Sequence, residues 1–304
     1  MENKSIINSP FAKTLVYANV FIAVCAFAQV LMTYFLFHLP FNFSTVSYLV
    51  FVTLSTFLQY NMQRAPMLFS QLFQRVAIYL KHRVWVPYEP GPETNANERL
   101  QWLNKNRKIF LTINLSSLVL LLFLCNWLSW TSIYIMIGAE VVSTLYYKQP
   151  FNLRRYGYIK PFLISSIWAI SCVLVPLIEF SKVTPESYYF LIAKFLFIAE
   201  LCVVFDINDS EKDFQDGVFT YANKLGLTFT KVFCIVLLAG SGIMYGLFIK
   251  ETIFIIFALA FLLLCTVFSL LANNKKHSFY YYMIIDGLML MQPLFYLAPV
   301  ILGF

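Results

Sequence analysis

The chain has 304 residues, of which 60% are apolar and 12% are charged, and its formal net charge is +7. Soluble globular proteins carry about 25% charged and 45–50% apolar residues, so this composition excludes an ordinary cytosolic enzyme and a disordered chain. The basic residues lie between apolar runs and form no single patch, which argues against a nucleic-acid-binding protein. The composition indicates a multi-pass integral membrane protein whose first partner is the lipid bilayer.

Nine apolar runs are each long enough to cross the hydrocarbon core of a bilayer, which is about 30 Å thick and needs about 20 residues per helix. We therefore predict an all-α protein, a polytopic membrane bundle of nine transmembrane helices that forms a single domain over residues 1–304. The expected spans are 14–38, 43–63, 109–128, 130–147, 161–180, 188–205, 229–249, 252–271 and 280–303.

Positive charge is divided unequally between the two ends of these spans. The amino-terminal residues and the loops after spans two, four, six and eight hold 19 of the 22 lysines and arginines, whereas the opposite loops hold Lys182 and Lys250. Cytoplasmic loops of membrane proteins carry the excess of lysine and arginine. We therefore expect the amino terminus in the cytoplasm and the carboxyl terminus on the opposite side.

The longest cytoplasmic loop, at about 64–108, contains a helical pattern of its own. Between Met67 and Leu80 apolar side chains recur on one helical face, and polar side chains such as Gln71 and Arg75 occupy the other. This periodicity is typical of an amphipathic helix that lies in the membrane interface. The segment is either a connector on the membrane surface or a lid over a site.

Four of the five aspartates fall in a short segment directly after the sixth span. At about 100° per residue they share an arc of about 80° on one helix face. Like charges on one face repel each other, and each is costly at bilayer depth, so a cation is expected to offset them. Mg²⁺ takes oxygen ligands, often one or two carboxylates together with substrate phosphates. The alternative is a solvated acidic loop in which Lys212 and Lys224 are local partners. The four residues are Asp206, Asp209, Asp213 and Asp216.

The same segment resembles the second aspartate motif of the UbiA superfamily of intramembrane prenyltransferases, D-x-x-D-x-x-x-D-x-x-x-G followed by a threonine and an L-G pair. A second similarity follows span four, where the family has a Tyr/Pro/Phe stretch, basic residues and a tyrosine. The matching residues of the first motif are Asp206, Asp209, Asp213, Gly217, Thr220 and Leu225-Gly226. Those of the second are Tyr146–Phe151, Arg154, Arg155, Tyr156, Lys160 and Pro161.

The chain departs from the family at the end of span two. There the family carries its first motif, N-x-x-x-D-x-x-x-D, which supplies the other half of the Mg²⁺ ligands. This chain has no aspartate in that region, and its span two ends in Gln59-Tyr60-Asn61-Met62-Gln63-Arg64. Of the motif, the asparagine type alone is kept, at Asn61.

The resemblance implies a nine-helix bundle around a central cavity open to the cytoplasmic side, with a Mg²⁺ site near the mouth of that cavity. Asp206, Asp209 and Asp213 would be the metal ligands and catalytic residues in an aspartate-motif loop at about 206–228. The residues expected to approach the substrate diphosphate are Arg154, Arg155, Tyr156, Lys160, Arg64 and Asn61.

Each of these substrate-binding residues also has a structural interpretation. Arg154, Arg155 and Lys160 are positioned to anchor the chain in lipid headgroups. Arg64 stands where the family has an acidic motif, so it either neutralises diphosphate in place of one Mg²⁺ or sets the topology. Asn61 is either a ligand or an amide used in helix packing.

The implied activity is transfer of a prenyl group from a polyprenyl diphosphate to a small lipophilic or aromatic acceptor, with release of pyrophosphate. Two alternatives remain open. One is a membrane terpene cyclase, in which the allylic cation is captured within the same molecule. The other is a catalytically silent prenyl-diphosphate-binding or partner protein, because the first aspartate motif is missing.

Four ionisable residues lie inside the apolar runs, where a charged side chain is by default a candidate for function. The alternative for each is structural pairing, and Lys194 in particular is expected to pair with an acid across helices. The four are Glu140, Lys194, Glu200 and Asp286.

Overall fold

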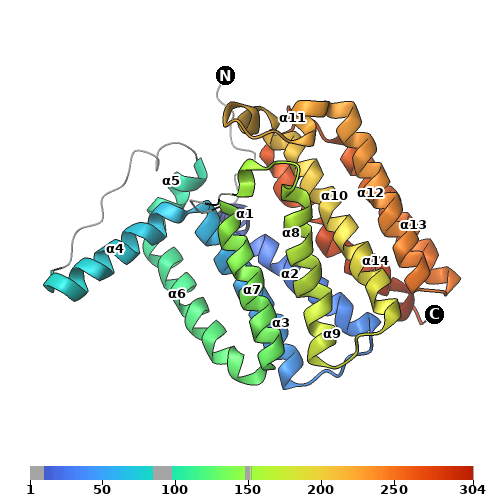
Figure 1. The fold of residues 1–304 in the computed structure, drawn as a ribbon, viewed down its shortest axis with the longest axis horizontal. Coiled ribbons are helices and arrows are strands. Elements are labelled where there is room, and N and C mark those ends of the chain that lie inside the picture. Colours follow the sequence, from blue (N-terminus) through green and yellow to red (C-terminus); the bar gives the residue numbers. More distant parts are fainter. Residues whose placement is uncertain (1–9, 85–97, 148–150, 152, 304) are drawn as a thin grey trace.

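The computed structural model describes residues 10–84, 98–147, 151 and 153–303 (Figure 1). In these ranges the chain forms helices and turns and no β-strand, so the predicted all-α class is confirmed. The α-helices are α1 (Pro10–Tyr17), α2 (Val20–Leu36), α3 (Phe43–Arg64), α4 (Pro66–His82), α5 (Glu98–Lys105), α6 (Arg107–Leu124), α7 (Trp130–Tyr147), α8 (Lys160–Ala169), α9 (Val175–Glu179), α10 (Pro185–Gln215), α11 (Tyr221–Leu225), α12 (Leu227–Phe248), α13 (Thr252–Leu271) and α14 (Leu288–Ile301).

Six helical segments of the described chain are long and apolar enough to cross a membrane, which supports a multi-pass membrane protein. Helices α1 and α2 make a seventh if the bent pair is one span. Helices α7 and α10, which the sequence predicts as spans, are not among these segments. The six are Phe43–Arg64, Arg107–Trp127, Lys160–Glu179, Leu227–Phe248, Thr252–Leu271 and Tyr280–Ile301.

The first predicted span, 14–38, is broken in the structure and is not one straight helix. Asn19 lies between α1 and α2 with a φ of 58°, in the left-handed region, and the two helices meet at an angle of 69°. A non-glycine residue with positive φ is uncommon, and asparagine tolerates it better than most residues do. The break points the Asn19 side chain into a buried polar cluster described below.

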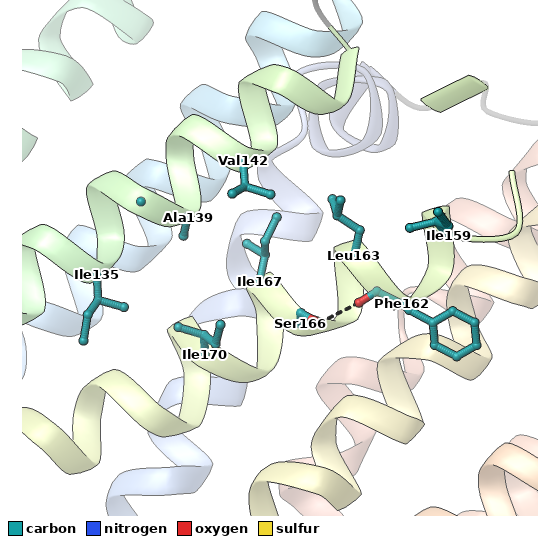
Figure 2. A pocket seen from close by; sticks show the side chains of 10 residues that line it. Ile135, Ala139, Val142, Ile159, Phe162, Leu163, Ser166, Ile167 and Ile170 are labelled. Atoms are coloured by element: carbon teal, nitrogen blue, oxygen red, sulfur yellow. Dashed lines mark hydrogen bonds between the residues drawn. The ribbon is translucent and has the colours of Figure 1, made fainter. Parts of the chain in front are cut away.

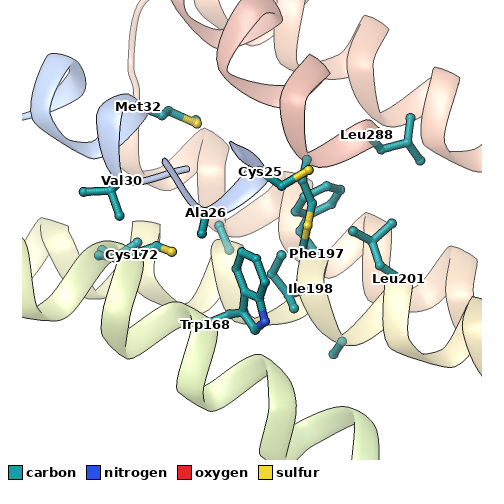
Figure 3. Close-up of a cluster of buried hydrophobic side chains, with 14 of the residues drawn as sticks. Cys25, Ala26, Val30, Met32, Trp168, Cys172, Phe197, Ile198, Leu201 and Leu288 are labelled. Atoms are coloured by element: carbon teal, nitrogen blue, oxygen red, sulfur yellow. The ribbon is translucent and has the colours of Figure 1, made fainter. Parts of the chain in front are cut away.

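Helix α10 is the central element of the bundle. It packs against α8 on one side and α12 on another, while α2 packs against both α3 and α14. Figure 3 shows how side chains from four separated parts of the chain meet in the core, with Trp168 beside Ile198 and Phe197 and with Cys172 near Val30. A helix buried on most of its circumference is apolar all round, which explains the almost continuous apolar sequence of α10 before Asp206.

Two π-helical stretches interrupt the helices of this core. Ile170–Leu174 joins α8 to α9, and Tyr280–Ile285 precedes α14. Single π-turns are rare and often lie at functional sites. The second stretch ends directly before Asp286 and positions Tyr281 and Tyr282 beside Phe205 of α10, with ring centroids 5.8 and 6.0 Å from that phenyl ring.

Helix α4 confirms the predicted amphipathic helix and lies across the direction of the long helices, projecting from the edge of the bundle (Figure 1). Its first turn packs Leu68 and Phe69 into a small cluster with Phe110 of α6. Farther along, Phe73 and Leu80 are 59% and 65% exposed. Exposed apolar side chains on a projecting helix fit a position in the membrane interface. Residues 85–97 of the predicted 64–108 segment lie outside the described chain.

Helix α10 extends beyond the apolar run and includes the aspartate segment. Its start is fixed by Pro185 and by a capping box in which Thr184 and Ser187 satisfy each other's backbone N–H groups. It continues for 31 residues to Gln215, so the first ten residues of the predicted 206–228 loop are helical. Gly217, with a φ of 73°, then turns the chain toward α11.

Candidate functional site

The candidate site lies where the start of α8 meets the last turns of α10. The ammonium nitrogen of Lys160 is 2.6 Å from Asp206 Oδ1 and 3.6 Å from Asp213 Oδ2. Both aspartates are 0% exposed. The structure therefore brings together one of the four predicted basic residues and two of the three predicted metal ligands.

The local sequence explains this geometry. Asp206 and Asp213 are seven residues apart, two turns of helix, so both carboxylates lie on the side of α10 that faces α8. Lys160 is the first residue of α8, with Pro161 after it. A lysine at a helix amino terminus opposes the helix dipole, and the two carboxylates opposite it offset both positive charges.

The other two aspartates of the segment, the predicted ligand Asp209 and the non-ligand Asp216, are less buried. Asp209 Oδ1 accepts a hydrogen bond from Asn208 Nδ2 at 2.8 Å, and Asp216 is exposed at the end of the helix. Asp206 Oδ2 is buried and has no hydrogen-bond partner among the described residues. A buried carboxylate oxygen without a donor fits a hard divalent cation. No group of three histidine, cysteine, aspartate or glutamate side chains within the described chain is arranged to hold a metal ion by itself, so substrate oxygens or water would complete any such site.

The segment before α8 also packs against the segment that follows α10. The Tyr221 hydroxyl donates to the Tyr158 carbonyl oxygen at 3.4 Å, and the two rings meet edge to face with centroids 5.1 Å apart. Thr220 caps α11 in a capping box with Asn223, whose amide also donates to the Val218 carbonyl oxygen at 2.8 Å. The threonine of the predicted motif is therefore a structural cap that holds the turn after α10.

The remaining residues of the predicted basic motif lie near this turn without a described contact to the aspartates. Arg155 and Tyr156 are exposed, and Tyr156 is 60% exposed. Residues 148–150 and 152 and the side chain of Arg154 lie outside what the structure describes. Lys160 is the basic residue of this motif that contacts the acidic face.

Asn61 belongs to a buried chain of amides. Asn19 Nδ2 donates to Asn61 Oδ1 at 2.7 Å, and Asn61 Nδ2 donates to Asn114 Oδ1 at 3.1 Å. Arg64 Nη1 donates to Asn19 Oδ1 at 2.9 Å. These contacts join the start of α2 to α3 and α6. The packing interpretation of Asn61 therefore accounts for both the oxygen and the nitrogen of its side-chain amide.

Arg64 lies between two aromatic rings. Its guanidinium carbon is 5.1 Å from the Tyr60 ring centroid and 5.2 Å from that of Tyr282, within the range of cation–π attraction. Asp286 lines the same small pocket as Arg64 and Tyr282. Tyr282 also packs against Phe205, the residue before Asp206, so aromatic side chains connect this cluster to the turn of α10 that carries Asp206.

The buried Lys194 does not have the acidic partner that we expect from the sequence. Its ammonium donates to Gln292 Oε1 at 2.7 Å and to Gln29 Oε1, and it lies 5.4 Å from the Phe190 ring centroid. Gln29 and Gln292 are polar residues inside apolar runs, and this feature of the sequence could have identified them as partners of Lys194. Glu200 accepts a hydrogen bond from Ser269 on α13, and Glu140 is exposed on α7.

A groove of about 560 Å³ runs between α7 and α8 (Figure 2). Its only hydroxyl-bearing lining residue, Ser166, donates to the Phe162 carbonyl oxygen at 2.7 Å and so has a partner within its own helix. The other lining side chains are apolar and face one another across the groove. They include Ile135, Ala139 and Val142 of α7, Leu163 and Ile167 of α8, and Ile170 of the π-helical stretch that follows α8.

The chain matches no protein-family model, no curated protein and no solved structure.

Proposed function

We propose that the protein binds a polyprenyl diphosphate through Mg²⁺ at the Asp206–Asp213 face of α10 and transfers the prenyl group to a small lipophilic or aromatic acceptor. The observation that carries this proposal is the burial of two carboxylates against Lys160, with Asp206 Oδ2 left without a donor in the part of the chain that the structure describes. Burying charged side chains inside a membrane protein is energetically unfavourable. A role in function would explain why both carboxylates are nevertheless buried.

In this proposal the aspartates of α10 bind the metal cation, and Lys160 binds the diphosphate anion. Asp206 and Asp213 hold the metal, with Asp209 at the more open edge. Mg²⁺, when bound, would neutralise the diphosphate oxygens and stabilise the charge on the leaving pyrophosphate. Lys160 adds a fixed positive charge beside the same oxygens, a preorganised donor that requires no movement during bond cleavage.

The bond changes then follow from where these charges lie. The allylic C–O bond breaks and its electron pair leaves with the diphosphate, which the positive groups stabilise. The acceptor supplies the electron pair of the new bond to carbon and gives up a proton. Aromatic faces near Asp206, such as Phe205 and Tyr282, are suited to stabilise an allylic cation.

The proposal includes the finer topology. Seven candidate spans, with α1 and α2 counted as one, together with α7 and α10, would make nine crossings around a central cavity open to the cytoplasmic side. The amino terminus and the Asp206–Asp213 face would be cytoplasmic, and the carboxyl terminus would lie on the opposite side, as the distribution of lysine and arginine predicts. Labelling of single cysteines placed at Asp216 and at Lys250 with a membrane-impermeant reagent tests this orientation, because the two should react from opposite sides.

A second candidate is a silent prenyl-diphosphate-binding protein. It is favoured by the contacts of Asn61 and Arg64, the residues that stand at the end of span two in place of the family's first aspartate motif. Both are engaged with Asn19, and Asn61 also with Asn114. With these groups used in packing, the chain offers one acidic face for metal instead of two.

The experiment that tests the shared part of both candidates is equilibrium binding of geranyl S-thiolodiphosphate to the full-length protein in nanodiscs. We expect binding with Mg²⁺, at least a tenfold loss with a chelator, and a similar loss in Asp206→Asn and Asp213→Asn. Asp216→Asn, an exposed aspartate of the same helix, is the matched control and should bind normally. Binding that is indifferent to Mg²⁺ and to both buried aspartates contradicts the proposal.

Turnover separates the two candidates. Geranyl diphosphate and a panel of aromatic acceptors are incubated with the protein, and pyrophosphate release is measured. Release that requires Asp206 supports the transferase, whereas tight binding without release across donors and acceptors supports the silent binder.

A further inference from the structure

The groove between α7 and α8 begins beside the proposed diphosphate site. Ile159 and Phe162, which line its upper end, flank Lys160 in sequence. Lys160, Leu163, Ile167 and Ile170 are spaced by three or four residues, so they share one face of α8. The groove is therefore the continuation, along the helix, of the face that carries the ammonium.

Helix α7 reaches the same point from the other wall. Tyr146, one turn after the lining residue Val142, is buried near Lys160. Asp206 contacts the same ammonium from α10. The polar end of the groove thus carries a cation and an acidic face, and the rest of it is apolar.

We propose that this groove holds the isoprenoid chain of the bound diphosphate, with the diphosphate at Lys160 and the tail toward Ile135 and Ile170. This inference rests on the proposed function, because it assumes that the diphosphate binds beside Asp206. It assigns the path of the chain to the α7–α8 face and the preferred substrate class to long isoprenoids.

The dimensions of the groove select the chain length. From Ile159 to Ile170 the α8 wall rises by about 16 Å at 1.5 Å per residue. An isoprene unit adds four carbons along the chain, about 5 Å when extended, given carbon–carbon bonds of about 1.5 Å. The groove therefore accommodates about three to four isoprene units, and a chain of two units, about 10 Å long, leaves much of its lower half empty.

Gly138 lies on the α7 wall at this lower half. A Cβ atom at Gly138 would have no atom within 4 Å, so a larger side chain enters open space and causes no clash. Gly246, on α12, has the same open surroundings and the same helical setting but is not among the residues that line the groove. The pair provides a variant that fills the groove and a control that does not.

The test compares two ligands, geranyl and geranylgeranyl S-thiolodiphosphate, in equilibrium binding to the full-length protein in nanodiscs with Mg²⁺. We expect the longer ligand to bind at least tenfold more tightly to the unmodified protein. Gly138→Leu should remove most of that advantage and leave geranyl binding unchanged, whereas Gly246→Leu should change neither affinity.

Each other outcome overturns a defined part of the inference. Equal affinities of the two ligands, or equal effects of Gly138→Leu and Gly246→Leu, mean that the chain lies elsewhere and that lipid acyl chains occupy the groove. In those cases Mg²⁺-dependent geranyl binding still supports the proposed function. Absence of any geranyl binding to the unmodified protein rejects the diphosphate site and, with it, this inference.

A second measurement locates the chain directly. A geranylgeranyl analogue with a diazirine at its far end is bound and irradiated, and the labelled peptides are identified by mass spectrometry. Labels on α7 or α8 near Ile135 or Ile170 support the inference. Labels confined to other helices overturn it.

Discussion

The backbone at Gly157 lies directly against the carbonyl group of Phe219. A Cβ atom at Gly157 would stand 2.4 Å from that carbonyl oxygen and 2.9 Å from the Thr220 methyl carbon. The segment before α8 is thus pressed against the turn that follows α10, and this contact, together with the ring pair Tyr158–Tyr221, fixes Lys160 relative to Asp206. A glycine is required here for close approach, which is one of the uses of glycine in proteins.

The first prediction concerns Gly157→Ala. The added methyl group meets backbone atoms that cannot rotate away, so the two segments must separate, at a cost of about 1–3 kcal/mol, as for other overpacked sites. We expect a lower melting temperature in detergent and weaker Mg²⁺-dependent diphosphate binding. Gly246→Ala, which adds the same methyl group in open space, should keep both properties. An unchanged melting temperature in Gly157→Ala would show that the two segments do not pack this closely.

The second prediction concerns the ion pair between Lys160 and Asp206. Lys160→Met leaves two buried carboxylates without their ammonium, and removing one partner of a buried pair typically costs about 3–5 kcal/mol. Asp206→Asn in the same chain removes one of the stranded charges. We therefore expect the double variant to be more stable than Lys160→Met alone, as measured by thermal unfolding in detergent.

A double-mutant cycle completes this experiment. The four proteins are the unmodified chain, Lys160→Met, Asp206→Asn and the double variant, and the coupling energy is the departure from additivity. Additive effects would mean that the ammonium and the carboxylate do not interact in the membrane-embedded protein.

The third prediction separates packing from substrate binding at Asn61. Asn61→Ala leaves Asn19 Nδ2 and Asn114 Oδ1 without their partner, and each buried unsatisfied group costs about 1–3 kcal/mol. We expect a clear loss of thermal stability and, at a temperature where the variant is folded, unchanged affinity for geranyl S-thiolodiphosphate. A loss of affinity in the folded variant would instead assign Asn61 to the ligand.

The sequence predicted the acidic face of α10 because helical periodicity is a local property. The spacing of Asp206 and Asp213 places them on one side of any helix, whatever surrounds it. The choice of Lys160 as the contacting cation, among the basic residues of its segment, depends on how α8 crosses α10. That crossing is a tertiary property that one sequence without its fold does not reveal.

The same distinction explains what the sequence missed. The 14–38 run is long enough and apolar enough for one span, and a single polar residue such as Asn19 does not by itself predict a break. The left-handed Asn19 contacts Asn61 and Arg64, which are distant in sequence. Likewise the acid expected for Lys194 was replaced by amides from α2 and α14. Neutral amide oxygens accept hydrogen bonds from an ammonium. Because amides are uncharged, they are harder to recognise in the sequence of a span as partners of a lysine than acidic residues are.

The last prediction concerns Glu179, at the end of α9. Its carboxylate accepts hydrogen bonds from Ser129 N at 3.0 and 3.2 Å, from Ser129 Oγ at 2.7 Å and from Ser132 Oγ. Ser129 lies in the turn between α6 and α7 and Ser132 in the first turn of α7, so one acid fixes the α6–α7 hairpin to the rest of the bundle. Glu179→Gln places an amide NH₂ against donors, and hydrogen bonds to a charged group contribute about 1.5–3 kcal/mol. We expect thermal stability to fall by that order. Glu186→Gln, which changes an exposed acid in the first turn of α10, should cause a smaller change.

Because the hairpin includes α7, Glu179→Gln should also loosen the α7 wall of the groove. Increased protease cleavage or hydrogen exchange between Cys125 and Tyr147 would report this loosening. Unchanged exchange there, in a variant that is measurably less stable, would mean that α7 is held by contacts other than Glu179.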